Sequence, residues 1–251
     1  MVINNINKVI IKFGYTIKKI ASPVPLDLRT EKEFLSLYDL CAPYTQTSIE
    51  RLYSLYQSCL YVIENDIKGD LVECGVWRGG SSMMMALTLL VRGVSDRKIY
   101  MYDTYEGMSD PSSHDIAVDG ELAENKLLKE DKTQEDSIWC YASFEEVSKN
   151  IASTKYPAEN IKMIKGKVEE TLPLYHPEKI ALLRLDTDWY ESTKVELERL
   201  YPLLNTNGPL IIDDFGHWEG AKKAVIDYFA EQKSYPLLSR IDITGRLIIK
   251  N

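Results

Sequence analysis

Two pairs of aspartates follow two apolar segments, and their spacing is the first feature of the chain that suggests chemistry. Asp186 and Asp188 come directly after the β-prone run IALLRL, and Asp213 and Asp214 come after GPLII. In an open parallel sheet, ligands bind beyond the carboxyl ends of the strands. If these two strands adjoin, four carboxylates converge there, and their mutual repulsion calls for a cation. Carboxylate oxygens favour magnesium, manganese or calcium over zinc.

A glycine-rich turn, ECGVWRGGSS, lies between another apolar segment and a helix-like segment. Gly75, Gly79 and Gly80 allow the backbone to approach a ligand, although tight strand-to-helix turns also use glycine for geometry alone. Glu73 would repel a pyrophosphate, which disfavours NAD and favours a cofactor with a positively charged amino-acid portion. Asp103, at the end of the next β-prone run, can accept the hydroxyls of a ribose. S-adenosylmethionine meets these demands.

The segments that must position these residues alternate between two hydrophobic periods. Short β-prone runs, separated by helix-like segments, lie at residues 70–76, 98–104, 161–166, 180–188 and 208–215. This alternation predicts a parallel sheet covered by helices. The tail LLSRIDITGRLIIK predicts a closing hairpin around Thr244 and Gly245. By analogy at the level of the fold, we expect an α/β, Rossmann-like methyltransferase fold: a seven-stranded, mostly parallel sheet with a C-terminal antiparallel hairpin.

Two helix starts and one long insertion are also predicted. Thr47 with Glu50, and Ser143 with Glu146, have the spacing of capping boxes. The polar, acidic stretch at about residues 107–140 is longer than a crossover between parallel strands needs. Loops of this length often act as lids, although a surface insertion without that role fits the same composition.

The first 20 residues have an amphipathic, basic pattern. Isoleucines and a phenylalanine recur at alternating three- and four-residue spacing with lysines off that stripe, which predicts a helix. The apolar stripe would pack on the main domain or a second subunit, or lie on an anionic membrane surface as a peripheral contact. We therefore expect residues 1–43 to form a helix and extension, and residues 44–251 to form the methyltransferase domain with its lid-like insertion, in a homo-oligomer.

Composition restricts the partners and the compartment. The chain has 30 lysines and arginines against 38 aspartates and glutamates, and no long basic block follows residue 20, so nucleic acid is a poor partner. Its four cysteines form no CxxC pair, which suits reduced thiols in a cytoplasm. The longest apolar run, Met83 to Val91, is too short to span a bilayer. We expect a soluble, cytoplasmic protein.

Four motifs together, ECGVWRGGSS, YDTYEG, LRLDTDWYEST and GPLIIDDFGHWEGAKKAV, resemble the macrocin O-methyltransferase family, from about residue 44 to the C-terminus. The resemblance implies magnesium-dependent methyl transfer from S-adenosylmethionine to a sugar hydroxyl of a natural-product glycoside or a polysaccharide precursor. By motif position it implies Asp186, Asp213 and Asp214 as metal ligands and Asp188 as the general base. It also implies cofactor contacts by Glu73, Gly75, Gly79 and Ser81 around the methionine portion, Asp103 at the ribose, and Gly166 and Lys167 at the adenine.

Two other functions fit part of the pattern. Asp186-Thr187-Asp188 has the form of the DxD motif, which in glycosyltransferases binds the metal of a nucleotide-sugar. A subunit that binds S-adenosylmethionine without turnover is the other alternative. Glu73 argues against the first, and the presence of both aspartate pairs argues against the second.

The sequence allows more than one role for several residues near the aspartates. His217 is a rival general base, because its ordinary pKa lies near neutrality, or it positions the loop. Trp189, Tyr190 and Trp218 would stack on a sugar ring or pack in the core. Arg184 is placed to balance a buried carboxylate from behind the site.

Overall fold

The structure is a computed structural model that describes residues 24–132, 134 and 137–251, so the helix predicted at residues 1–20 lies outside it. The chain divides into two units, Met1–Leu35 and Ser36–Asn251. Helix η2 (Leu26–Thr30) lies in the first unit, and α2 (Lys32–Cys41) begins there. The second unit contains the sheet and is described below.

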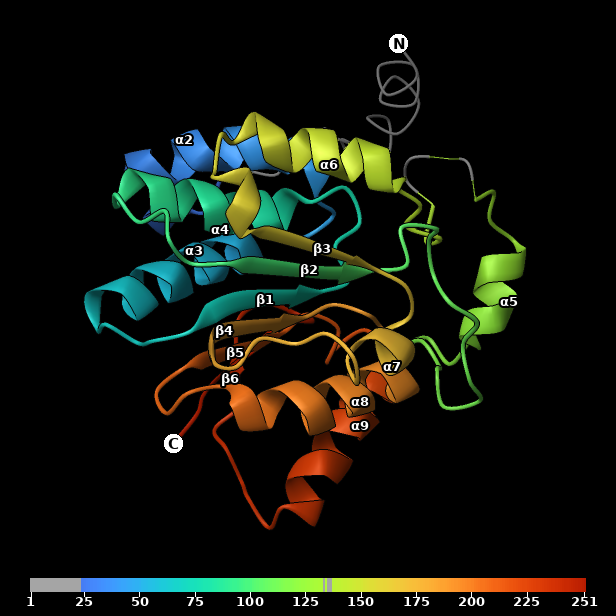
Figure 1. Ribbon diagram of the computed structural model, residues 1–251. Helices are drawn as coiled ribbons and strands as arrows, with labels where there is room; N and C mark the ends of the chain where they lie inside the picture. Colours follow the sequence, from blue (N-terminus) through green and yellow to red (C-terminus); the bar gives the residue numbers. More distant parts are fainter. Residues whose placement is uncertain (1–23, 133, 135–136) are drawn as a thin grey trace, which may run out of the picture. The chain divides into compact units, whose positions relative to one another are not determined.

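Seven strands form one sheet in the part of the chain that the structure describes, in the order β3-β2-β1-β4-β5-β7-β6 (Figure 1). They are β1 (Asp70–Cys74), β2 (Ile99–Asp103), β3 (Ile161–Lys165), β4 (Ile180–Leu185), β5 (Pro209–Ile212), β6 (Ser239–Arg240) and β7 (Arg246–Ile249). Strands β1 to β5 pair in parallel, and β7 pairs antiparallel with β5 and β6. The predicted fold, including its C-terminal antiparallel hairpin, is confirmed.

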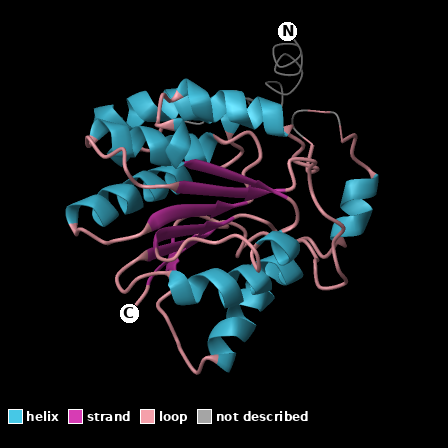
Figure 2. Ribbon diagram, in the orientation of Figure 1, coloured by secondary structure: helices cyan, strands magenta, loops and turns pink. Residues whose placement is uncertain are grey.

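Helices cover both faces of this sheet (Figures 1 and 2). One face is covered by α3 (Ile49–Glu64), α4 (Gly80–Val91) and α6 (Phe144–Ser153), and the other by α7 (Val168–Thr171), α8 (Tyr190–Leu200) and α9 (Glu219–Glu231). Short connecting helices are η3 (Ala42–Tyr44), α5 (Ala123–Leu128), η4 (Ala158–Asn160) and η5 (Tyr201–Leu203). None of the described helices is long and apolar enough to cross a membrane.

The central strand β4 is apolar on both sides because helices cover both faces of the sheet. All six of its residues are buried, and each buried leucine or isoleucine contributes about 1.5–3 kcal/mol relative to an exposed side chain. The one charged member, Arg184, has 2% of its surface exposed. A buried guanidinium is tolerated only with acidic partners, and these lie at the carboxyl end of the sheet.

The start of α3 differs from the prediction. Ser48, not Thr47, is the N-cap: its backbone is extended and its hydroxyl accepts a hydrogen bond from the Arg51 N–H at 3.1 Å. Thr47 stands one residue too early to cap, so the predicted capping box is wrong, and its hydroxyl instead donates to Oδ2 of Asp213 at 3.0 Å. The cap predicted at Ser143 is confirmed.

Candidate active site

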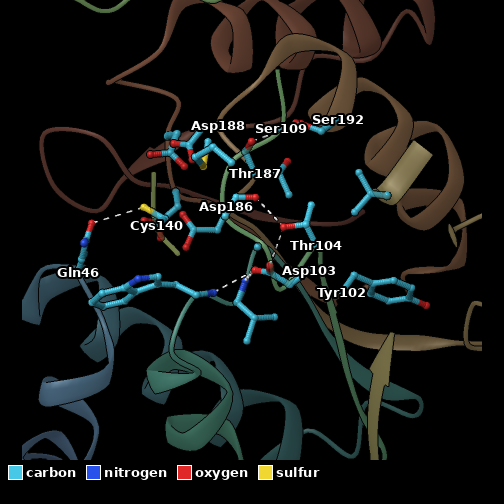
Figure 3. A pocket seen from close by; sticks show the side chains of 18 of the residues that line it. Gln46, Tyr102, Asp103, Thr104, Ser109, Cys140, Asp186, Thr187, Asp188 and Ser192 are labelled. Atoms are coloured by element: carbon cyan, nitrogen blue, oxygen red, sulfur yellow. Dashed lines mark hydrogen bonds between the residues drawn. The ribbon is translucent and has the colours of Figure 1, made fainter. Parts of the chain in front are cut away.

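A cavity of about 270 Å³ lies at the carboxyl ends of β1, β2, β4 and β5, where the strand order changes direction (Figure 3). Two groups of residues line it, one that follows β1 and ends β2, and one that follows β4 and β5. We call the first group, Gly75, Val76, Trp77 and Asp103, the glycine wall, and the second group, Asp186, Asp188, Asp213 and Asp214, the acidic wall. One continuous space therefore connects the glycine turn to all four predicted aspartates.

The glycine wall is held by its own hydrogen bonds. Oδ2 of Asp103 accepts from the N–H groups of Val76 at 2.7 Å and Trp77 at 3.1 Å, and Oδ1 accepts from the N–H of Tyr105 at 2.6 Å. Burial raises the pKa of Asp103, and these backbone bonds oppose the rise. The hydroxyl of Thr104 makes a fourth, longer bond to Oδ1 at 3.4 Å, so a ribose hydroxyl would compete with Thr104 for this carboxylate.

Gly75 brings the two walls together. Its φ is +80°, and a Cβ at this position would lie 1.9 Å from the carbonyl oxygen of Asp186. Only glycine allows this approach, because every other residue would clash with the backbone after β4. The family resemblance implies a cofactor contact for Gly75, and the structure adds a second role: Gly75 lets the turn after β1 approach the backbone after β4.

The other predicted cofactor residues divide into two sets. The described lining of the cavity includes Ser81, Gly166 and Lys167 but neither Gly79 nor Glu73. Gly79 is the N-cap of α4, with a φ of +95°. In this position it turns the chain into the helix that carries Ser81, and a contact between Gly79 and the cofactor stays a prediction.

Glu73 lies behind the glycine wall and is fully buried. Its carboxylate accepts from Nη1 of Arg184 at 2.7 Å and from the hydroxyl of Ser82. Burial raises the pKa of Glu73, and the neighbouring guanidinium opposes this. A direct contact between Glu73 and the cofactor stays a prediction.

The acidic wall differs from the glycine wall, because one of its buried carboxylate oxygens has no hydrogen-bond donor among the described residues. One oxygen from each of Asp186, Asp213 and Asp214 lies within 4.8 Å of the others. Burial, with added repulsion from nearby carboxylates, raises the pKa of Asp186 and of Asp214 well above the ordinary value. When these groups are ionised, no donor among the described residues reaches the buried Oδ2 of Asp214. An all-oxygen donor set with an unpaired buried oxygen fits a hard divalent cation.

Asp188 stands beside this cluster with its backbone in the left-handed region, at a φ of +69°. Aspartate tolerates this conformation better than most residues. Burial raises the pKa of Asp188 to about 8, Asp186 adds to the rise, and hydrogen bonds from Asp214 and Trp218 oppose it. The result is a carboxylate with a proton affinity far above that of an exposed aspartate.

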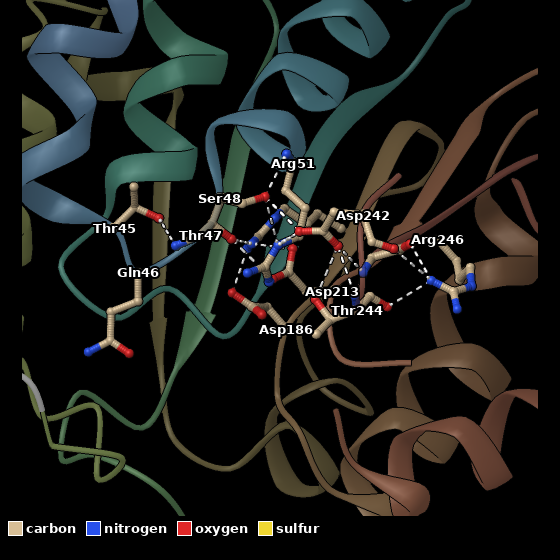
Figure 4. Close-up of polar contacts among 12 residues, drawn as sticks. Thr45, Gln46, Thr47, Ser48, Arg51, Asp186, Asp213, Asp242, Thr244 and Arg246 are labelled. Carbon is tan, nitrogen blue, oxygen red and sulfur yellow. Dashed lines mark hydrogen bonds and ion pairs between the residues drawn. The ribbon is translucent and has the colours of Figure 1, made fainter. Parts of the chain in front are cut away.

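Two arginines bond carboxylates of the acidic wall, and Figure 4 shows one of them, Arg51, beside Asp213 and Asp242. Arg184 bonds Oδ2 of Asp186 through Nη1 at 2.7 Å and Oδ1 of Asp213 through Nη2 at 2.6 Å, which confirms its predicted role. Arg51, on α3, bonds Oδ2 of Asp213 through Nη1 and Oδ2 of Asp242 through Nε at 3.0 Å. Neither Arg51 nor Asp242 carries a motif in the sequence that marks it as part of the site.

The aromatic residues pack in the core more than they face a ligand. Trp189 and Trp218 are buried, with ring centroids 4.9 Å apart in an edge-to-face arrangement, although Trp218 also borders the cavity. The hydroxyl of Tyr190 donates to Asp227 at 3.0 Å. His217 borders the cavity, and partial burial lowers its pKa.

The insertion at about residues 107–140 is tied to the loops that carry the aspartates. Fully buried Asp115 accepts a hydrogen bond from the N–H of Tyr190 at 2.8 Å, at the start of α8. The indole of Trp189 donates to the carbonyl of Ser109 at 3.0 Å. Asp115, which also accepts from Ser112, therefore links the insertion to the start of α8, a contact that the sequence did not reveal. A lid-like role for the insertion stays a prediction.

Comparison with known proteins gives the family. The chain matches the family model for macrocin O-methyltransferase (TylF) over residues 38–249. A demethyldecarbamoylnovobiocin O-methyltransferase from Streptomyces niveus and an 8-demethyl-8-(2,3-dimethoxy-alpha-L-rhamnosyl)-tetracenomycin-C 4'-O-methyltransferase from Streptomyces olivaceus are each 33% identical over 202 residues. Each match covers 80% of this chain and 74% of the relative.

The fold comparison agrees. The solved structure of the O-methyltransferase NovP is 31% identical and superposes with a TM-score of 0.72, covering 83% of this chain and 82% of that one. Together with the parallel sheet and the cavity at its switch point, these matches show that the chain belongs to the macrocin O-methyltransferase family and is an S-adenosylmethionine-dependent O-methyltransferase.

Proposed function

We propose that this enzyme methylates a sugar hydroxyl, in a glycosylated natural product or a polysaccharide precursor, and that it requires a divalent cation, magnesium, at the acidic wall. The unpaired, buried Oδ2 of Asp214 beside Asp186 and Asp213 is the observation that carries this proposal. The name of the Streptomyces olivaceus relative contains a rhamnosyl group, which supports a sugar-containing acceptor.

Asp186, Asp213 and Asp214 would hold the cation. When bound, the cation supplies positive charge next to the acceptor hydroxyl, and S-adenosylmethionine supplies a methyl group on a positively charged sulfur. Asp188 would accept the hydroxyl proton on a carboxylate oxygen. An ordinary aspartate, with a pKa of about 3.9, is a poor base for an alcohol.

Burial makes Asp188 a stronger base, because it raises the pKa to about 8. The same rise leaves the carboxyl group largely protonated at neutral pH while the cluster carries only negative charge. Positive charge at Asp186 and Asp214 would lower the pKa of Asp188, since opposite charges favour the ionised form. A cation at the acidic wall would therefore keep Asp188 ionised, so that it can accept the hydroxyl proton.

The glycine wall would bind the cofactor, and the continuous cavity supports this arrangement. Gly75 and Ser81 would adjoin the methionine portion, and Asp103 would accept from a ribose hydroxyl in place of its long bond from Thr104. Gly166 and Lys167, which precede α7, would adjoin the adenine. Glu73 would act through Arg184 from behind this wall.

Family membership favours methyl transfer over the glycosyltransferase alternative, although the chain contains a DxD sequence. The predicted homo-oligomer, the cytoplasmic compartment, the peripheral membrane contact through residues 1–20, and the division of the chain at residue 43 remain proposals. Size-exclusion chromatography with light scattering, and liposome sedimentation of full-length and 21–251 proteins, would test the oligomer and the membrane contact.

A methyl-transfer screen tests the proposed function. Purified enzyme and S-adenosylmethionine are incubated with deoxysugar glycosides and polysaccharide precursors, and S-adenosylhomocysteine is measured. We expect turnover with at least one sugar acceptor, loss of turnover in EDTA, and recovery with added magnesium. Activity that survives EDTA would contradict the cation requirement, and calorimetric binding of UDP-sugars but not of S-adenosylhomocysteine would contradict methyl transfer.

A further inference from the structure

Both carboxylate oxygens of Asp213 already accept hydrogen bonds from this chain's own side chains. Oδ1 accepts from Arg184 at 2.6 Å, and Oδ2 accepts from Thr47 at 3.0 Å and from Arg51. Only 1% of the residue is exposed. Asp214, by contrast, keeps an oxygen without a donor among the described residues. Because Oδ2 of Asp213 already accepts from two donors, a cation that binds this oxygen must displace one of them.

The two arginines differ in their freedom to move. Arg184 lies within β4, is 2% exposed, and bonds three acidic residues at once, Glu73, Asp186 and Asp213. Arg51 lies at the first turn of α3, borders the cavity, and has 15% of its side chain exposed. Arg51 is therefore the partner that can leave Asp213.

A second carboxylate, that of Asp242, already bonds Arg51. Asp242, before β7, already accepts from Nε of Arg51 at 3.0 Å. The Asp242 side chain is fixed by the N–H groups of Thr244 at 2.9 Å and Gly245 at 2.7 Å, and by the hydroxyl of Ser48 at 2.6 Å. A guanidinium has five N–H donors, so Arg51 can release its Nη1 bond to Asp213 while it keeps its Nε bond to Asp242.

We propose that Arg51 is an internal competitor for the cation: it neutralises Asp213 when the site holds no metal, and cation binding shifts its guanidinium toward Asp242. The inference rests on the proposed cation site. Arg51 sets the affinity of that site, because each cation that binds must displace one positive charge from the same oxygen. Asp242 assists binding, because it stabilises the displaced arginine.

Calorimetry with Mn²⁺ alone, on the full chain without cofactor or acceptor, tests this competition through two substitutions of opposite sign. Arg51→Met should tighten Mn²⁺ binding, by about tenfold. Asp242→Asn keeps an oxygen for the two backbone N–H groups but removes the charge that receives Arg51, so it should weaken binding. Arg78→Met is the matched control: it also removes one positive charge, but Arg78 bonds Glu146 and the carbonyl of Pro43, and its affinity should match that of wild type.

The outcomes separate the inference from the proposed function. If wild type binds Mn²⁺ and Arg51→Met binds it equally well or more weakly, the competition is overturned but the cation site stands. Absence of Mn²⁺ binding from every variant would contradict the cation site itself. If Arg51→Met does not fold without metal, Asp242→Asn decides the question, because an affinity equal to or above that of wild type would overturn the inference.

Discussion

The glycine wall and the acidic wall face the same cavity, but their polar groups are satisfied in different ways. In the glycine wall, the Asp103 carboxylate accepts three backbone N–H groups, and the turn is complete without a ligand. In the acidic wall, Asp214 keeps an unpaired oxygen, and burial raises the pKa of Asp186, Asp188 and Asp214. The difference indicates that the glycine wall is preformed, whereas the acidic wall would be completed by what binds to it.

The charge balance leads to the same conclusion. Arg184 and Arg51 supply two positive charges against Glu73, Asp242 and the four aspartates of the acidic wall. Two like charges about 4 Å apart repel by about 4 kcal/mol at an effective dielectric constant of 20. The acidic wall therefore holds protons when it has no cation, and a divalent cation would replace them.

The largest expected effect comes from removing Asp188, the proposed base of the acidic wall. Asp188→Asn keeps the size of the side chain, and asparagine tolerates the left-handed backbone. We expect turnover to fall by about 10²–10⁴-fold. Binding of S-adenosylhomocysteine and Mn²⁺, measured by calorimetry, should remain, because neither site loses a ligand. Full activity of this variant would show that Asp188 is not the base.

Removing the centre of the glycine wall should act on stability instead. Asp103→Ala leaves the N–H groups of Val76, Trp77 and Tyr105 without an acceptor, and each unpaired buried donor costs about 1–3 kcal/mol. We expect the free energy of unfolding to fall by about 3 kcal/mol in urea titrations. Mn²⁺ affinity should stay at the wild-type value. A loss of Mn²⁺ binding as large as the loss of stability would mean that the two walls are not independent.

The smallest expected effect concerns Glu196, which lies behind the acidic wall. Its Oε1 accepts from the Thr187 hydroxyl at 2.9 Å, Oε2 has no partner among the described residues, and burial raises its pKa well above the ordinary value. A raised pKa stabilises the fold below the ordinary pKa, and this contribution is lost as pH rises toward the folded-state pKa. The loss is about 1.4 kcal/mol per pH unit within that interval.

Glu196→Gln cannot ionise, so it should remove this loss. Compared with wild type, the variant should become relatively more stable by about 1.4 kcal/mol between pH 5 and pH 6 in thermal melts without metal. Parallel stability curves for the two proteins over this range would show that Glu196 does not hold its proton in the folded state.

Sequence patterns predict the arrangement of strands better than the side-chain partners. The carboxyl ends of β4 and β5 must adjoin once the alternation predicts a parallel sheet, so the approach of Asp186 to Asp213 follows from strand pairing. The choice between Thr47 and Ser48 as the cap of α3 does not follow, because both hydroxyls fit the local pattern. Only the path of the chain into the helix decides it.

Ion-pair and packing partners that come from distant elements could not be predicted from the sequence. Arg51 and Asp242 come from α3 and from the turn before β7, and no local spacing relates them to the acidic wall. Trp189 directly follows Asp188 and Trp218 comes four residues after Asp214, yet their large apolar rings are buried against each other. Tertiary packing determines these contacts, so they become visible only in the folded chain.

The central claim is that the acidic wall is incomplete without a cation, and Mn²⁺ binding by wild type and Asp214→Asn tests it most directly. Asparagine keeps one oxygen but removes the charge of the residue with the unpaired atom. The account predicts one Mn²⁺ site on wild type and an affinity at least about tenfold weaker in the variant. Equal affinities for the two proteins, or no Mn²⁺ binding by wild type, would contradict it.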